Sequence, residues 1–182
     1  ADATDGVGRS SRDWETHQTI ITSDHRLGTV FAHESDLGLI ETAVLDGVTL
    51  QGQYTGGTVY HTGGAFLNEG EIIDGGTVKG NQPVLRNVRI EGFGASRGAG
   101  IYNGPGSHMV LDNVDIMNNV GSGSSGGILN EGTMTIMNSK ISHNSSGSGS
   151  ITNTGTLTIM NSDISDNTVS GSGGGIYNGN GE

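Results

Sequence analysis

The chain has 182 residues, a formal net charge of −11 and no cysteine. The negative charge argues against nucleic acid as a partner, because phosphate binding needs many lysines and arginines. The missing thiols exclude disulfide bonds and thiolate metal sites, and the lack of any apolar run of about 18 residues predicts no membrane span. The 34 glycines alternate with regularly spaced Ile, Leu, Val and Met, which favours an ordered repeat over disorder.

The first residues differ from the rest of the chain. Residues 1–16 are polar and aperiodic, and we expect them to form an N-terminal arm ahead of a repeat domain at 17–182. A strand-like pattern begins at Thr19. The stretch 51–84 departs from the later period and predicts a longer excursion, whereas the repeats are clearest over 85–182.

A tetrapeptide that ends in Asn recurs at intervals of 23 to 27 residues, at 100–103, 127–130, 150–153 and 175–178. A period of this length indicates a solenoid. The apolar residues alternate with polar ones at period 2, as in strands with one buried face. We therefore expect an all-β fold, a right-handed parallel β-helix of about six coils, since parallel crossovers are almost always right-handed.

The stretches 121–127, 145–150 and 168–175 are expected to be loops that lie at the same point of successive coils. Stacking the repeats also predicts four columns of inward side chains. One column turns from Val to Ser along the chain, so the core should become more polar toward the C-terminus. The columns are Leu45, Leu85, Leu111, Ile136 and Ile159; Leu50, Ile90, Ile116, Ile141 and Ile164; Val48, Val88, Val114, Ser139 and Ser162; and Phe66, Ile101, Ile128, Ile151 and Ile176.

Three columns of Asn stand between the expected strands. Asn tolerates the left-handed conformation of a sharp corner, and its amide can bond to the same amide one coil away. We therefore expect structural ladders rather than catalytic groups. The columns are Asn87, Asn113, Asn138 and Asn161; Asn68, Asn103, Asn130, Asn153 and Asn178; and Asn119, Asn144 and Asn167. The sequon Asn144-Ser145-Ser146 leaves glycosylation open.

One outward column alternates in charge. Opposite charges on neighbouring strands fix the register and contribute about 0.2–1 kcal/mol each. A polysaccharide lyase would instead need a base and a carboxylate cluster, for which Arg86, Arg89 and Arg97 beside Asp112 and Asp115 are the candidates. Such a cluster would break the repeat at one coil, so we expect a charge ladder and no catalytic residues. The ladder comprises Arg89, Asp115, Lys140 and Asp163.

We expect no cofactor. The histidines at 17, 25, 33, 61, 108 and 143 share no ligand spacing, and His143 occupies a repeat position that also holds Asp166, which predicts a solvated side chain. Calcium could bind only at unspecific acidic sites, namely Asp2, Asp5 and the group Glu69, Glu71 and Asp74.

Two further sets of residues predict outward surfaces. The first is a column that could stack sugars or pack as part of the structure, namely Tyr102, Leu129, Thr152 and Tyr177. The second is the threonine pairs at 133 and 135 and at 156 and 158, which resemble an ice-binding array. Met109 and Val110 occupy the matching place one coil earlier, so the array is too short.

The repeats resemble a known family. Gly63-Gly64-Ala65-Phe66, Ile141-Ser142-His143-Asn144 and Ile164-Ser165-Asp166-Asn167 are similar to the Gly-Gly-Ala-Ile and Phe-x-x-Asn elements of right-handed β-helix repeat proteins. These are secreted and surface proteins of prokaryotes, related to polymorphic outer-membrane protein repeats and autotransporter passengers. The resemblance covers about residues 43–182, with Ile in place of Phe in the second element. It implies an extracellular or cell-surface location, but such repeats occur in adhesins, cell-wall proteins and carbohydrate-active enzymes alike.

The two ends of the repeat domain carry matching patterns, since residues 18–24 resemble residues 157–163. Two explanations stay open: a fragment of a longer surface adhesin, or a subunit that stacks head to tail into a fibre, because open strand edges accept further strands. The second predicts an interface of Thr19, Ile20, Ile21, Ile176, Tyr177 and Asn178. The function expected is a non-catalytic structural or adhesive module that binds itself or a cell-surface partner. The alternative is a carbohydrate-binding or carbohydrate-active β-helix that takes a polysaccharide.

Overall fold

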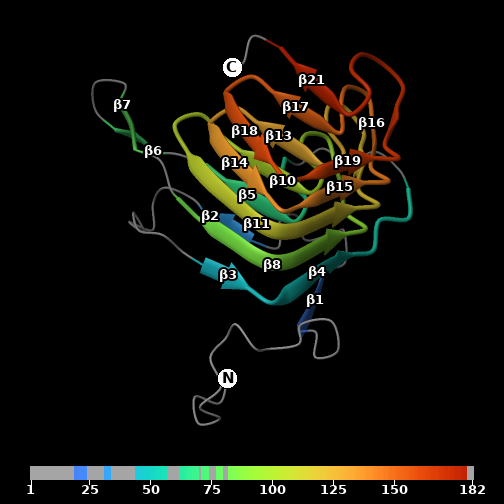
Figure 1. Ribbon diagram of the computed structural model, residues 1–182, viewed down its shortest axis with the longest axis horizontal. Helices are drawn as coiled ribbons and strands as arrows, with labels where there is room; N and C mark the ends of the chain where they lie inside the picture. Colours follow the sequence, from blue (N-terminus) through green and yellow to red (C-terminus); the bar gives the residue numbers. More distant parts are fainter. Residues whose placement is uncertain are drawn as a thin grey trace.

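Parallel strands stack into a β-solenoid of about five turns (Figure 1). The computed structural model describes residues 19–23, 31–33, 44–56, 62–69, 71–73, 77–79 and 82–179, and within these ranges it contains no helix. The all-β parallel solenoid predicted from the repeats is confirmed, with about five turns in place of the six expected. The expected arm at 1–16 lies outside the described residues.

Three parallel sheets form the sides of the solenoid, and we number them by size. Sheet 1 contains β1 (Thr19–Ser23), β3 (Val44–Asp46), β4 (Val48–Gly52), β8 (Val84–Glu91), β11 (His108–Met117), β14 (Thr133–Met137), β15 (Lys140–Ser142), β18 (Thr156–Met160) and β19 (Asp163–Ser165). Sheet 2 contains β2 (Phe31–His33), β5 (Phe66–Asn68), β10 (Ile101–Asn103), β13 (Ile128–Asn130), β17 (Ile151–Asn153) and β21 (Ile176–Asn178). Sheet 3 contains β9 (Gly94–Ala95), β12 (Val120–Gly121), β16 (Ser145–Ser146) and β20 (Thr168–Val169).

Sheet 3 corrects one expectation. The stretches 121–127, 145–150 and 168–175 are not loops throughout, because their first residues take part in the two-residue strands β12, β16 and β20. The expected excursion within 51–84 contains an antiparallel hairpin of β6 (Glu71–Ile73) and β7 (Thr77–Lys79), which projects from the stack in Figure 1.

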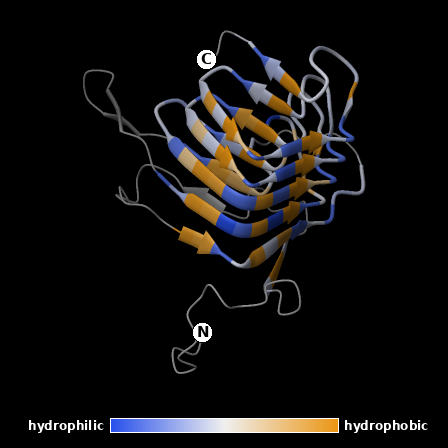
Figure 2. Cartoon of the chain, in the orientation of Figure 1, coloured by the Kyte–Doolittle hydropathy of each residue, from blue (hydrophilic) through white to orange (hydrophobic). Residues whose placement is uncertain are grey.

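The core lies inside the solenoid. It contains the inward columns predicted from the repeats and also the paired Met109 and Met134, which those columns did not include. Figure 2 shows hydrophobic bands at matching positions of successive strands. In β11, Leu111 and Ile116 are fully buried while Asp112 and Asp115 point outward. These two buried positions continue in register on both neighbouring turns. The column of Ile101 in sheet 2 runs in the same way from Phe66 to Ile176.

The change from Val to Ser in one column has a local explanation. The Ser139 hydroxyl donates to the Met137 carbonyl at 2.6 Å and accepts from the Val114 amide at 3.0 Å. One turn later, Ser162 accepts from the Ser139 amide at 3.1 Å in the same manner. The column therefore passes from apolar contact to hydrogen bonding without leaving its inward position.

Residues with positive φ mark two corners of the turns. Such a conformation favours Gly, Asn, Asp and His, because other side chains clash with the backbone there. The first corner comprises Gly47, Asn87, Asn113, Asn138 and Asn161, with φ of 69°, 52°, 56°, 50° and 49°. The second comprises Gly92, Asn118, His143 and Asp166, with φ of 75°, 56°, 57° and 55°. His143 is exposed at this second corner, so its position reflects backbone geometry.

Candidate functional site

A continuous ladder of buried asparagines runs along sheet 2. Each of five side chains, one on every turn from β5 to β21, is joined to the next by an amide–amide hydrogen bond of 2.7–2.8 Å. The residues are Asn68, Asn103, Asn130, Asn153 and Asn178. The first four are buried, and only Asn178 at the last strand is exposed. Several amides also bond to a backbone carbonyl, as Asn103 does to Thr133 at 3.1 Å.

A second ladder follows the corner beside sheet 3. Asn119 Nδ2 donates to Asn144 Oδ1 at 3.1 Å, and Asn144 Nδ2 donates to Asn167 Oδ1 at 3.2 Å. Each carbonyl oxygen also accepts a backbone N–H one turn earlier, as Asn119 Oδ1 does from Phe93 at 2.9 Å. Asn144 is fully buried, and its Nδ2 also bonds to the Ile116 carbonyl at 2.9 Å. The sequon that begins at Asn144 is therefore inaccessible to a glycan in the folded chain.

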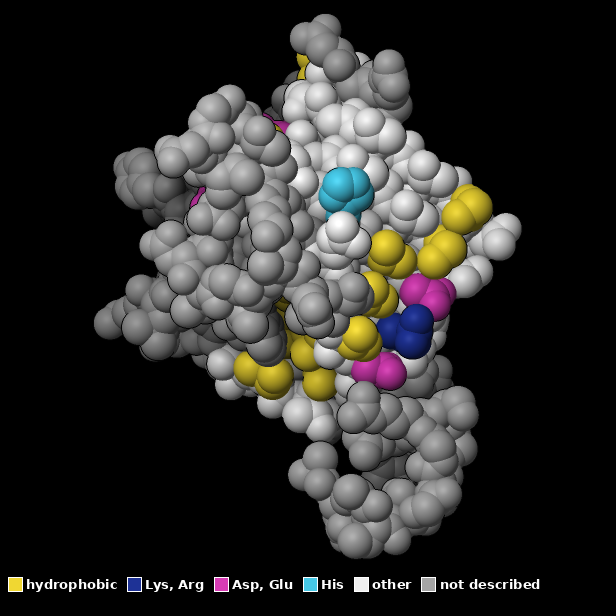
Figure 3. Space-filling view, turned by 90° about the vertical axis from the view of Figure 1, so that its left-hand side faces the viewer, with side chains coloured by type: hydrophobic (Ala, Val, Ile, Leu, Met, Phe, Trp, Pro, Cys, Tyr) yellow, Lys and Arg dark blue, Asp and Glu magenta, His cyan; other side chains and the backbone are white. Residues whose placement is uncertain are grey.

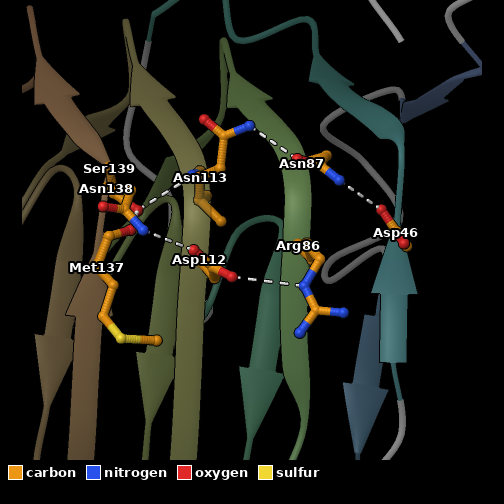
Figure 4. Close-up of polar contacts among 9 residues, drawn as sticks. Asp46, Arg86, Asn87, Asp112, Asn113, Met137, Asn138 and Ser139 are labelled. Carbon is orange, nitrogen blue, oxygen red and sulfur yellow. Dashed lines mark hydrogen bonds and ion pairs between the residues drawn. The ribbon is translucent and has the colours of Figure 1, made fainter. Parts of the chain in front are cut away.

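The third predicted ladder is only partly formed. Asn113 donates to Asn87 at 2.7 Å, but Asn138 donates to Asp112 at 3.0 Å instead of to Asn113, and Asn87 donates to Asp46 at 2.9 Å (Figure 4). The shared property of this column is its left-handed backbone. Every Asn column was expected to supply both a left-handed corner and amide bonds between turns. In the structure, this column supplies the corner, and the two buried ladders supply the continuous amide bonds.

Charged side chains on the outside of sheet 1 lie in alternating rows. Arg89, Asp115, Lys140 and Asp163 occupy paired positions on β8, β11, β15 and β19. Arg89 pairs with Asp115 at 3.3 Å and Lys140 with Asp163 at 3.8 Å. In the neighbouring row, Arg86 Nε lies 3.5 Å from Asp112 Oδ2. Each of these cations faces a carboxylate on the next strand, which fixes the register.

Arg97 lies elsewhere, which corrects its expected place beside Asp112 and Asp115. It forms an ion pair with Glu131 and lies over the ring of Tyr102, 5.4 Å from the ring centre. The Tyr102 hydroxyl donates to the other Glu131 oxygen at 2.6 Å. Burial of Tyr102, together with this bond to Glu131, raises the pKa of Tyr102 well above its ordinary value. These contacts join the segment before β10 to the residue that follows β13 on the next turn.

The column expected to be external is mostly covered. Tyr102, Leu129 and Thr152 are 5%, 3% and 7% exposed, and only Tyr177 on the last strand is 39% exposed. The segment before each strand folds over these side chains, as shown by the bond from Thr152 Oγ1 to the Ser148 carbonyl at 2.9 Å. A sugar could reach this column only at Tyr177.

Of the two residues expected to match the threonine pairs one turn earlier, the structure places one opposite a threonine. Thr133 is opposite His108, and Thr135 is opposite Val110. Val110 thus occupies the matching place as expected, whereas Met109 is opposite Met134 and is buried in the core. The regular threonine array therefore covers β14 and β18 alone.

The six residues of the expected end-to-end interface lie at opposite ends of the stack. Thr19, Ile20 and Ile21 belong to β1, which is the first strand of sheet 1 and pairs with β4. Ile176, Tyr177 and Asn178 form β21, which is the last strand of sheet 2. The residues are not brought together within one chain.

Metal-binding candidates find no support within the described residues. No group of three His, Cys, Asp or Glu side chains there could hold an ion. Asp2, Asp5 and Asp74 lie outside these residues, and Glu69 is exposed. Likewise, no helix of the described chain is long and apolar enough to cross a membrane.

The contact of Arg97 and Tyr102 with Glu131 was not predicted from the sequence. Arg97 and Tyr102 lie on one turn and Glu131 lies on the next, so no local motif links all three. One signal was present, since Glu131 directly follows Asn130, and Glu69 directly follows Asn68 in the same way. Comparison of the chain with protein-family models, curated proteins and solved structures gives no match.

Proposed function

We propose that this chain is a rigid structural or adhesive module of an extracellular or cell surface, without catalytic activity. The observation that carries the proposal is the buried ladder from Asn68 to Asn178. Hydrogen-bonded polar networks stiffen a fold. This one joins every turn from β5 to β21, and its one buried side-chain oxygen without a partner in the described chain is Asn68 Oδ1, at the first rung. The paired charges on sheet 1 support the same role, since they join strands rather than converge on one point. The resemblance to surface β-helix repeats supports the location.

We further propose that the module associates with copies of itself through its end strands. Apolar side chains are exposed at both ends: Ile20 is 52% exposed on β1, and Ile176 is 41% exposed on β21. Ile21 belongs to the inward column that ends at Ile164 on β19. If a second copy placed its β1 beside β19, its Ile21 would extend this column by one residue. The free edges of β1 and β19 would then be hydrogen-bonded to each other. Strand addition of this kind repeats without closing and builds a fibre.

Sedimentation of the 182-residue chain over a concentration series, with electron microscopy of the same samples, tests the proposal. We expect assemblies that grow with concentration and elongated particles. Ile176→Lys should suppress them, because it places a charge on β21, the last strand of sheet 2 at the same end of the stack as β19. Met117→Lys on the side of sheet 1 should not suppress them. A chain that stays monomeric at every concentration would refute self-association.

The proposal of a non-catalytic module needs its own test. The purified chain is incubated with acidic polysaccharides, and chain length is followed by size-exclusion chromatography. We expect no depolymerisation. Cleavage that is lost in Arg89→Ala, with an unchanged circular dichroism spectrum, would replace the structural role with a carbohydrate-active one.

A further inference from the structure

The outer surface of the first half of sheet 1 forms one face, which we call the valine face. It consists of the outward side chains of β3, β14 and β18 and of the first halves of β8 and β11. Its middle column contains only β-branched residues: Val44, Val84, Val110, Thr135 and Thr158. The column beside it comprises Asp46, Arg86, Asp112, Met137 and Met160.

The valine face exposes more apolar surface than a solvated sheet requires. Val44 is 53% exposed and Met160 43%, while Val84, Val110 and Met137 are half-buried. Figure 3 shows the hydrophobic side chains gathered in a band that passes beside one cation between two carboxylates. A contiguous apolar band with a polar margin is typical of an interaction surface.

The charges on this face can form further contacts. The ion pair within the chain joins Arg86 Nε to Asp112 Oδ2, and the two terminal nitrogens of the guanidinium point away from it in Figure 4. A guanidinium has five N–H donors, and a carboxylate can accept several bonds at each oxygen. The side chain of Arg86 is 50% exposed and that of Asp112 27% exposed. Both residues can therefore meet an opposite charge on another molecule.

We propose that the valine face binds the valine face of a second copy of this chain. A two-fold axis parallel to the strands, passing between β8 and β11, places Arg86 of each copy opposite Asp112 of the other. The same axis places Val84 opposite Val110 in both directions. The two central pairs are thus complementary to themselves, cation against carboxylate and valine against valine, as a two-fold interface requires. The next residues of the row, Asp46 and Met137, lie opposite each other at the margin. Two flat sheet faces pack in this way at a spacing of about 10 Å.

This lateral pairing does not rest on end-to-end assembly. It uses the side of the stack, and it closes at two copies because each face is covered by the other. To measure it alone, all chains in the experiment carry Ile176→Lys, which blocks the end strand. Sedimentation equilibrium should then give a concentration-dependent species of twice the 18.6 kDa chain mass.

The decisive test separates contacts between chains from the ion pair within one chain. In the facing arrangement, Arg86→Asp leaves only carboxylates at positions 86 and 112 of both copies, and Asp112→Arg leaves only arginines. We expect each variant alone to be monomeric and an equimolar mixture to form a dimer, because each position 86 then meets an opposite charge at position 112. Labelling one variant with a fluorophore shows that the dimer is mixed.

Two controls complete the design. Arg89→Asp removes an ion pair on the other half of sheet 1, whose side chains are 32% and 28% exposed, and this variant should dimerise like the parent chain. Val110→Lys keeps both charges of the row but places an ammonium in the apolar band, and it should be monomeric with an unchanged circular dichroism spectrum. A parent chain that is monomeric at all concentrations, a Val110→Lys chain that still dimerises, or a mixture that stays monomeric overturns the proposal.

Discussion

Removing one rung of the buried ladder should destabilise the whole solenoid. Asn103 is fully buried. It accepts from Asn68 Nδ2 at 2.8 Å and donates to Asn130 Oδ1 at 2.8 Å and to the Thr133 carbonyl at 3.1 Å. In Asn103→Ala, Asn68 keeps its second bond, to the His108 carbonyl at 3.2 Å. Asn130 Oδ1 loses the one donor that it has in the described part of the chain, and it remains buried.

The expected loss follows from these contacts. The Asn130 acceptor left buried without a donor costs about 1–3 kcal/mol, and the two other lost bonds, from Asn68 and to the Thr133 carbonyl, have a net value of about 1 kcal/mol each. The sum is about 3–5 kcal/mol, a large share of the ~5–15 kcal/mol typical of a folded domain. Asn113→Gly is the matched control. It also removes an amide bond of 2.7 Å between turns, but at an exposed position, and Gly retains the positive φ.

Equilibrium unfolding in urea, followed by circular dichroism, measures both variants. We expect the midpoint of Asn103→Ala to fall far below that of the parent chain, and Asn113→Gly to lose less than about 1 kcal/mol. The slope of the free energy of unfolding against urea should stay the same in all three chains, so that the midpoints can be compared. A loss for Asn103→Ala no larger than that for Asn113→Gly would show that the buried ladder does not stabilise the fold.

Three further outcomes follow from individual positions. Asn138 has a φ of 50°, so Asn138→Val should lower the free energy of unfolding by about 1–2 kcal/mol more than Asn138→Gly does; equal thermal midpoints would contradict this. Tyr102 has a raised pKa, so above about pH 10 its hydroxyl loses a proton in the unfolded chain but keeps it in the folded chain, and the free energy of unfolding falls by up to about 1.4 kcal/mol per pH unit. Tyr102→Phe has no such proton, so its free energy of unfolding should fall less at alkaline pH. Identical alkaline unfolding profiles of the two chains would argue against this prediction. Ile128 is fully buried and Ile176 is 41% exposed, so Ile128→Ala should lose about 2–5 kcal/mol and Ile176→Ala much less, which urea unfolding of the two variants can check.

The core was predictable because its positions repeat. Leu111 and Ile136 occupy the same place in consecutive repeats, and parallel stacking leaves such residues one register. A one-residue slip would turn every inward side chain outward. The alternating charges were predictable for the same reason, since Asp115 and Lys140 are also one repeat apart.

The environment of the Asn and Tyr columns was not predictable in the same way. Asn113 and Asn130 are equally regular in the sequence, yet the first is exposed at a corner and the second is buried. What decides between them is the path of the chain outside the strands. Tyr102 was expected to be external, but the segment that contains Gly98 covers the outer face of sheet 2, where a Cβ on Gly98 would lie 3.2 Å from Leu129 Cβ. Such coverage depends on loop geometry that no periodic pattern encodes.

The buried ladders also give the solenoid a direction. In every amide pair of both ladders, Nδ2 belongs to the earlier turn and Oδ1 to the later one, from Asn68 to Asn178 and from Asn119 to Asn167. The side-chain dipoles therefore point the same way and reinforce one another along the axis. Reversing a single amide would set two donors against each other on one side and two acceptors on the other. The ladders thus act as aligned dipole chains whose orientation is set along their whole length, so that the two ends of the solenoid differ electrically as well as in sequence.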